Sequence, residues 1–167
     1  AAVKAAVGRI RPDAVINELT SLPRHYTPAD MKAAAERDRK VRVEGNISLL
    51  AALRDSGVRR YLLQSSGFWY APGAGLADES VPFISSASPG VEASARTYLE
   101  LEARASATPG IEFAALRYGF FYGPGTWYKA ATGTGALYVD AAAHAALLAV
   151  TKGRGIYNIA EDDGAVS

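Results

Sequence analysis

The sequence predicts an α/β fold built on a doubly wound parallel sheet. Short apolar runs rich in β-branched residues, of which residues 14–17 are the first, alternate with longer segments of helical periodicity. Strands separated by helices in this way indicate βαβ units with right-handed crossovers. The composition, 49% hydrophobic and 21% charged, is that of a globular domain. We therefore expect residues 1–167 to belong to one domain.

The first elements follow from glycine and proline punctuation. Residues 1–8 are alanine-rich and predict a helix that ends at Gly8. Residues 14–17 predict a strand buried on both faces, and residues 19–27 predict a loop. This loop is expected to leave the carboxyl end of the strand.

A long helical region is expected next. Thr27 is suited to cap it, Pro28 to occupy its first position and Gly57 to end it. The charged residues 36–40 are expected to form a solvated face. Apolar residues recur at helical spacing and should form the buried face: Val43, Ile47, Leu50 and Ala51.

The second half of the chain continues the alternation. Residues 58–64 predict a buried strand, and residues 66–90, rich in Gly, Pro, Ser and Asp, predict a long loop of the kind that carries function. The remaining predicted elements are a helix over 91–107, a strand over 111–117, a glycine-rich loop, a helix over 140–150 and a strand over 156–160. Residues 66–90 and 118–138 are the segments expected to contact a substrate.

Charge and cysteine content exclude several classes of partner. Eighteen Lys and Arg residues balance seventeen Asp and Glu residues, so no net field would draw the chain to nucleic acid or to a membrane. The absence of cysteine suits the reducing cytoplasm, where we expect the protein to reside. His25 and His144 lack companions at metal-ligand spacing, so no metal site is expected. Asp78 and Glu79 are expected to be solvated.

Hydroxyl side chains occur where the predicted strands end. In parallel α/β sheets the ligand lies outside the carboxyl ends of the strands, and three segments should meet there: residues 18–22, 65–70 and 118–125. Ser65 and Ser66 could hold a substrate carbonyl or alcohol by hydrogen bonding. The alternative is that these hydroxyls only satisfy backbone groups of a turn.

Five groups of short segments occur in a recognisable order and spacing. They are Pro12-Asp13-Ala14-Val15-Ile16, Val43-Glu44-Gly45 with Leu49-Leu50-Ala51-Ala52, Gly57-Val58-Arg59-Arg60-Tyr61 with Ser65-Ser66, Leu116-Arg117-Tyr118 with Tyr122-Gly123-Pro124-Gly125, and Val139-Asp140-Ala141-Ala142 with Ile156-Tyr157-Asn158-Ile159. Together they resemble the extended short-chain dehydrogenase/reductase superfamily, also called the NAD-dependent epimerase/dehydratase family. The resemblance implies a Rossmann-like sheet, NAD or NADP as cofactor, and a nucleotide sugar or another small carbonyl or alcohol compound as substrate.

The resemblance also implies roles for particular residues. Ser66, four residues before Tyr70, falls where the family keeps the serine that binds the reacting carbonyl or hydroxyl group. The residues that would contact the cofactor are Leu19, Thr20, Ser65, Tyr118, Gly119 and Phe120. The residues that would contact the substrate are Gly67, Tyr70, Phe121, Tyr122 and Thr126.

The chain departs from the family at its acid/base pair. The family uses a tyrosine and a lysine four residues later, because a proton must move as hydride moves. Aligning Glu102 with the family's glutamate puts Ser94 at the tyrosine position and Tyr98 at the lysine position. Tyr98 is therefore the candidate for a displaced catalytic acid, and the alternative is that it is a core residue.

The phosphate-binding glycine fingerprint is missing as well. No G-x-G-x-x-G turn follows a predicted strand, and no acidic residue is placed to hold a ribose. We therefore expect a partial Rossmann-like domain that lacks its N-terminal βαβ phosphate-binding portion within these residues.

Three functions remain open from the sequence. The leading hypothesis is an NAD(P)-dependent enzyme of the epimerase/dehydratase type with a degenerate Tyr/Lys pair. The alternative is a non-catalytic relative that binds the cofactor as a sensor. A third, weaker hypothesis is a scaffold or homodimer formed through the helical regions 28–56 and 91–107, which pair across subunits in many relatives.

Overall fold

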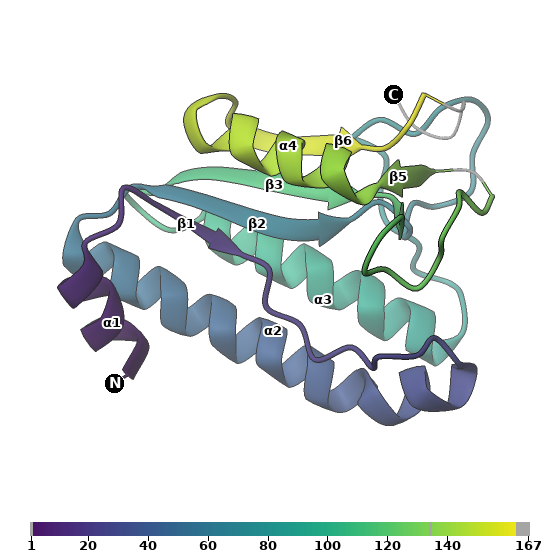
Figure 1. Cartoon of the computed structure of the whole chain (residues 1–167), viewed down its shortest axis with the longest axis horizontal. Helices are drawn as coiled ribbons and strands as arrows, with labels where there is room; N and C mark the ends of the chain where they lie inside the picture. Colours follow the sequence, from purple (N-terminus) through teal and green to yellow (C-terminus); the bar gives the residue numbers. More distant parts are fainter. Residues whose placement is uncertain (1, 134, 163–167) are drawn as a thin grey trace.

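The computed structural model of the chain describes residues 2–133 and 135–162 (Figure 1). Its elements, in chain order, are α1 (Ala2–Ile10), β1 (Ala14–Asn17), α2 (Pro28–Ser56), β2 (Arg60–Ser66), α3 (Pro89–Ser106), β3 (Glu112–Tyr118), β4 (Phe120–Tyr122), β5 (Ala136–Tyr138), α4 (Val139–Thr151) and β6 (Gly155–Ile159).

Four of the strands form a parallel sheet in the order β1-β2-β3-β6. Helices α1, α2 and α3 cover one face of this sheet, and α4 covers the other (Figure 1). The predicted doubly wound parallel sheet is therefore confirmed. Strands β4 and β5 pair separately as a small parallel ladder beyond the end of β3.

Helix α2 begins and ends as its sequence predicts. The Thr27 hydroxyl accepts a hydrogen bond from the Asp30 N–H at 3.1 Å, and Pro28 occupies the first turn. Gly57 ends the helix with a φ of 76°, a left-handed conformation that glycine adopts without strain. The end of α2 therefore fixes where the chain turns back toward β2.

The buried face of α2 differs from the prediction. Ile47 and Ala51 are exposed, whereas the polar residues Arg42 and Asn46 are buried. Asn46 can be buried because its amide is satisfied. Its Oδ1 accepts from the Tyr61 hydroxyl at 2.5 Å and its Nδ2 donates to the Leu101 carbonyl at 3.3 Å.

Some predicted boundaries were wrong, and two short strands were not predicted. Helix α1 does not end at Gly8 but continues to Ile10, and Arg11 then turns the chain with a φ of 49°. Strand β2 begins and ends two residues later than predicted, so Ser66 lies within it. Strands β4 and β5 were not predicted, because each is only three residues long.

Two apolar clusters fill the space between the sheet and its helices. One lies under α2 and α3 and includes Leu53, Tyr61 and Leu101. The other lies under α4 and includes Leu62 and Leu116. In the described part of the chain, none of the helices has the length and apolar character needed to cross a membrane.

The cluster under α2 and α3 should carry much of the stability. Leu53→Ala is expected to lower the free energy of unfolding by about 2–5 kcal/mol, because Leu53 has no exposed surface and its removal leaves a cavity. Leu147→Ala is the matched control, since Leu147 on α4 is 66% exposed and should cost at most about 0.5 kcal/mol. Urea denaturation measures both. Equal losses would contradict this placement of the core.

Candidate functional site

The carboxyl ends of the parallel strands lie together at one edge of the sheet. Ser66 on β2 is level with Tyr118 on β3, which is level with Ile159 on β6. The segments that follow these strands are in contact, because the Gly67 N–H donates to the Tyr118 carbonyl at 3.0 Å. This edge is where α/β sheets of this kind bind ligands.

The loop after β1 reaches the same edge. The Trp127 indole Nε1–H donates to the Pro23 carbonyl at 3.2 Å, and the Tyr26 ring packs on the Trp127 ring with centroids 5.0 Å apart. The loop after β1 therefore contacts the segment after β3, through residues that lie just outside the predicted ranges 18–22 and 118–125.

Ser66 at this edge is buried, and among the described residues no acceptor takes up its hydroxyl proton. Its Oγ accepts a long hydrogen bond of 3.5 Å from the Phe68 N–H. The O–H can therefore donate to a ligand. Its predicted role with the reacting group remains a prediction.

The adjacent Ser65 faces the opposite way. Successive side chains of a strand alternate between the two faces of the sheet, and the Ser65 hydroxyl donates to Glu102 Oε1 on α3 at 2.5 Å. The structure does not place Ser65 with Ser66 in one site. Its predicted contact with the cofactor remains untested.

Arg117 organises the region around Ser65. Its guanidinium donates to both carboxylate oxygens of Glu102, at 2.9 and 2.7 Å, and both side chains are buried. Burial alone would lower the pKa of Arg117, but hydrogen bonds to Glu102 and Tyr70 raise it above the usual value. This pair has no signature in the sequence, because its members are brought together by the packing of α3 against the sheet.

Arg117 also holds the long loop over the edge of the sheet. It donates to the Tyr70 hydroxyl at 2.8 Å and to the Glu79 carbonyl at 3.1 Å, and it lies over the Phe83 ring. The Tyr70 hydroxyl donates in turn to Asn158 Oδ1 at 2.6 Å. Burial raises the pKa of Tyr70, against the opposing effect of Arg117. The Tyr70 hydroxyl, expected to meet substrate, is engaged within the protein.

Glu79 is not simply solvated as predicted. Its Oε1 accepts a hydrogen bond of 2.6 Å from the Asn158 N–H of β6, so the carboxylate ties the loop to the sheet. Asp78 is exposed and accepts from the backbone N–H of Ser80 at 2.8 Å. The two neighbouring acids therefore have different roles.

The segment from Tyr118 to Phe120 turns the chain away from the sheet. Tyr118 is buried, and burial raises the pKa of its phenol, with the charge of Glu18 adding to the effect. Gly119 leaves no room for a side chain, because a Cβ there would overlap the Gly135 carbonyl. Phe120 follows with its ring 41% exposed. The predicted cofactor contacts of this segment are not tested.

Hydroxyls in the next segment also have internal partners. Tyr122 donates to Glu161 Oε1 at 2.6 Å, which raises the pKa of the Tyr122 phenol. The Thr126 Oγ1 lies 2.9 Å from the Gly123 carbonyl and 2.8 Å from the Tyr128 carbonyl. The neighbouring Phe121 ring packs on Tyr118, with centroids 5.3 Å apart. Substrate contacts predicted here would therefore come from rings rather than from these hydroxyls.

Thr20 is held by two charged residues of α2. Its hydroxyl donates to Asp38 Oδ1 at 2.8 Å and accepts from Arg42 at 3.0 Å. Arg42 and Asp38 form an ion pair of 2.7 Å, so residues 36–40 are not only a solvated face. Leu19 lies against Gly45, with the end of its side chain in the space that a Cβ at Gly45 would take. Of the six residues expected to contact the cofactor, Thr20 is thus held by α2 and Leu19 packs against it.

Tyr98 packs between helices. The Arg42 guanidinium lies 5.2 Å from the centre of its ring, and the ring contacts the apolar cluster under α2 and α3. Burial raises the pKa of Tyr98, and Arg42 opposes that effect. The Ser94 hydroxyl, one turn earlier, donates to the Gly90 carbonyl at 3.0 Å. The contacts of Tyr98 are those of an interhelical residue, and its role as an acid remains a prediction.

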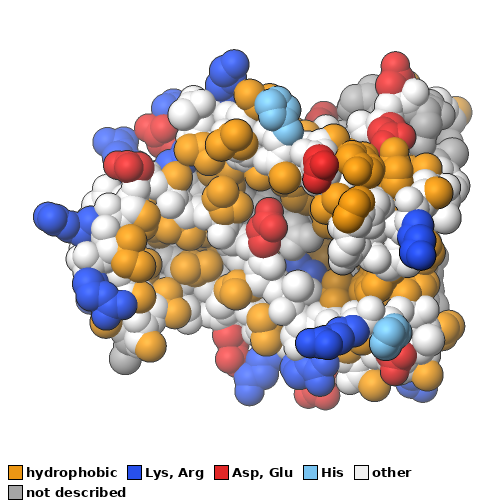
Figure 2. Space-filling view, viewed as in Figure 1, with side chains coloured by type: hydrophobic (Ala, Val, Ile, Leu, Met, Phe, Trp, Pro, Cys, Tyr) orange, Lys and Arg blue, Asp and Glu red, His pale blue; other side chains and the backbone are white. Residues whose placement is uncertain are grey.

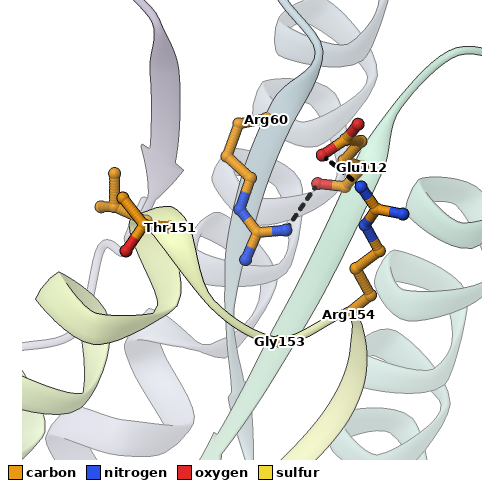
Figure 3. Close-up of a pocket in the computed structure, with 6 residues that line it drawn as sticks. Arg60, Glu112, Thr151, Gly153 and Arg154 are labelled. Atoms are coloured by element: carbon orange, nitrogen blue, oxygen red, sulfur yellow. Dashed lines mark hydrogen bonds and ion pairs between the residues drawn. The ribbon is translucent and has the colours of Figure 1, made fainter.

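A hollow of about 390 Å³ lies at the opposite edge of the sheet (Figure 3). Arg60 and Glu112, at the starts of β2 and β3, line it together with Arg154. Arg60 donates to the Ala149 carbonyl at 3.0 Å and to the Lys152 carbonyl at 2.8 Å, which satisfies the last turn of α4. This arginine is explained by helix capping, so the hollow is not the candidate site.

No metal centre is found among residues 2–133 and 135–162. No group of three or more His, Cys, Asp or Glu side chains lies close enough there to hold a metal ion.

Removing Arg117 should release the long loop. Arg117→Met leaves the Glu102 carboxylate buried without its partner, so we expect the free energy of unfolding to fall by about 3–5 kcal/mol. Amide hydrogen exchange should accelerate most in residues 66–90. Arg104→Met is the control, because Arg104 pairs with Glu100 on the surface of α3, and such pairs contribute about 0–1 kcal/mol. Unchanged exchange in the loop would refute the anchoring role.

Known proteins resemble this chain over most of its length. A 3-diazoavenalumate denitrifying reductase from a Streptomyces species is 38% identical over 135 residues, which are 80% of this chain and 43% of that protein. The UDP-glucose 4-epimerase of Thermus thermophilus, solved with NAD, has a TM-score of 0.71 at 23% identity, over 97% of this chain and 60% of that one. The corresponding enzyme of Brucella ovis, also solved with NAD, has a TM-score of 0.76 at 19% identity, over 99% and 62%.

The chain thus spans less than half of the curated relative and about 60% of these structures. Residues 1–137 match the family described as the NAD dependent epimerase/dehydratase family. With that match over most of its length, the chain belongs to the NAD-dependent epimerase/dehydratase family.

Proposed function

We propose that the chain is part of an NAD- or NADP-dependent oxidoreductase that acts on a small carbonyl or alcohol compound. The observation that carries the proposal is the position of Ser66, whose hydroxyl can donate a hydrogen bond at the carboxyl end of a central parallel strand. Relatives support it, since one is named as a reductase and two are UDP-glucose 4-epimerases solved with NAD.

The described residues fit part of a dinucleotide. Gly119 lets the backbone after β3 approach the Gly135 carbonyl closely, and Thr20 in the loop after β1 is hydrogen-bonded to Asp38 and Arg42 of α2. No glycine-rich turn for the pyrophosphate follows a strand in this sequence. We infer that dinucleotide binding belongs to the whole natural polypeptide that contains this chain.

In the proposed reaction, the nicotinamide cofactor when bound supplies or accepts hydride at the substrate carbon. The Ser66 hydroxyl donates a hydrogen bond to the substrate oxygen and stabilises the negative charge that develops on it. Gly67 keeps the backbone close to β3, where a Cβ would lie only 3.3 Å from the Arg117 carbonyl. Arg117 holds the covering loop and so helps to exclude water.

Replacing Ser66 tests this function. In the whole polypeptide, Ser66→Ala is expected to lower kcat by about a hundredfold, because one donor to the developing oxyanion is lost. NADH affinity, measured by calorimetry, should stay within about twofold. Ser48→Ala is the control, because Ser48 lies on the exposed side of α2. Failure to bind either dinucleotide would refute the proposal.

Tyr98 is the proposed acid, and Tyr98→Phe tests that role separately. A phenol is already protonated at neutral pH, and burial raises the pKa of Tyr98 further, so it can donate a proton but does not start as a base. Phenylalanine preserves the packing against Arg42, so a loss of turnover without a loss of stability would support the acid role. Unchanged turnover would assign Tyr98 to packing alone.

The alternative function is a sensor that binds the cofactor without turning over a substrate. Its support is the absence of the family's Tyr/Lys pair, with Ser94 and Tyr98 at those positions. Turnover that disappears in Ser66→Ala would exclude it. A nucleotide sugar as substrate is proposed only from the likeness to UDP-glucose 4-epimerases.

We also propose a homodimer formed through α2 and α3. Ile47 on α2 is 43% exposed and Leu99 on α3 is 41% exposed, so both helices present apolar groups outward. Light scattering should give twice the chain mass, and Leu99→Glu should shift it to the monomer, because a charge would then be buried. Leu147→Glu on α4 is the control. A monomeric wild-type protein would contradict the proposal.

A further inference from the structure

Two aromatic rings are exposed to solvent at the candidate site. The Phe68 and Phe120 rings are stacked, with centroids 3.8 Å apart and planes 9° from parallel. They are 39% and 41% exposed, whereas the rings of Tyr61, Phe83 and Phe113 are buried. Figure 2 shows hydrophobic side chains gathered over the loops that follow the strands.

The position of the stack follows from two glycines. Gly67 and Gly119 stand directly before Phe68 and Phe120; a Cβ at Gly67 would lie only 3.3 Å from the Arg117 carbonyl, and a Cβ at Gly119 would overlap the Gly135 carbonyl. They let the ends of β2 and β3 turn close together, which brings the two rings face to face. The stack therefore lies two residues beyond Ser66, on the two segments expected to contact the substrate.

The hydroxyls of these segments are already engaged. Tyr70 is held by Arg117 and Asn158, Tyr122 by Glu161, and Thr126 by backbone carbonyls. A sugar is recognised mainly through hydrogen bonds to its hydroxyls, and these side chains offer few free partners for them. The surface they leave is formed by flat apolar rings, which favour another flat ring.

Beside the stack lies a donor without an acceptor. The Trp69 ring packs edge-on to Phe68, with centroids 6.3 Å apart. Its indole N–H is shielded from water and finds no acceptor among the described residues. A buried donor normally has a partner, so an acceptor oxygen on a ligand would satisfy it.

We propose that the substrate of this site is a planar aromatic compound with an oxygen acceptor, whose ring packs on the stack of Phe68 and Phe120. This inference rests on the proposed oxidoreductase function and specifies its substrate class. The proposed substrate is therefore an aryl carbonyl or aryl alcohol compound and not a sugar.

Ligand binding to the whole natural polypeptide tests the inference. The probes are trans-cinnamate, 3-cyclohexylpropanoate, which has the same carboxylate on a saturated ring, and UDP-glucose, with binding followed by saturation-transfer NMR and titration. We expect cinnamate to bind at least about fivefold more tightly than the saturated acid, because only the planar ring can stack. This comparison uses the unmodified protein and does not depend on the folding of a variant.

Variants of the stack provide the second arm. Phe68→Leu and Phe120→Leu should each weaken cinnamate binding about fivefold to tenfold, while Phe120→Tyr, which keeps a ring, should stay within about twofold of the wild type. Tyr157→Leu is the matched control. The Tyr157 ring is 37% exposed, but its hydroxyl contacts Arg154 at the start of β6, away from the site.

Several results would overturn the inference. They are no binding of cinnamate, equal affinity in the leucine variants, or UDP-glucose binding that depends on the stack. A loss of NADH affinity in Phe120→Leu as large as the loss of cinnamate affinity would assign the stack to the cofactor ring instead. NADH binding is measured separately. If NADH does not bind, the proposed oxidoreductase function is refuted, whereas the substrate class is judged from cinnamate binding alone.

Discussion

The buried ion pair of Arg117 and Glu102 is the interaction on which the candidate site depends. Taking both charges out of water costs free energy, and the cost is offset only when the hydrogen-bonding groups are satisfied in good geometry. Glu102 receives two donors from Arg117 and one from Ser65. Arg117 places its remaining contacts on Tyr70 and the Glu79 carbonyl. A single planar group thereby fixes β3, α3 and the long loop relative to one another.

Local sequence signals predict the framework well. A cap such as Thr27 or a stop such as Gly57 acts within one helical turn, so its effect can be read without tertiary information. The burial of Asn46 could not be read in this way, because it depends on Tyr61 and Leu101 from other elements. A helix face that is buried through polar groups does not follow the apolar periodicity on which the prediction relied.

The location of the site was predictable, but its chemistry was only partly so. Parallel strands end at one edge, so the closeness of the segments that follow them is a consequence of topology. Whether a hydroxyl is free depends on partners far along the chain. The Tyr70 hydroxyl donates to Asn158 and the Tyr122 hydroxyl donates to Glu161, and neither partner can be recognised from the local sequence. Exposed rings beside these engaged hydroxyls are therefore visible only in the folded structure.

The hydrogen bond between Trp127 and Pro23 has a consequence for the rim of the candidate site. It joins residues 104 positions apart and lies outside both apolar clusters. Closing so long a segment carries an entropy cost, so we expect this contact to form after the strands have paired. Contacts made last, at the surface, are also lost first when a protein fluctuates. The rim of the site is therefore held by a surface contact whose loss would leave the sheet and both apolar clusters in place.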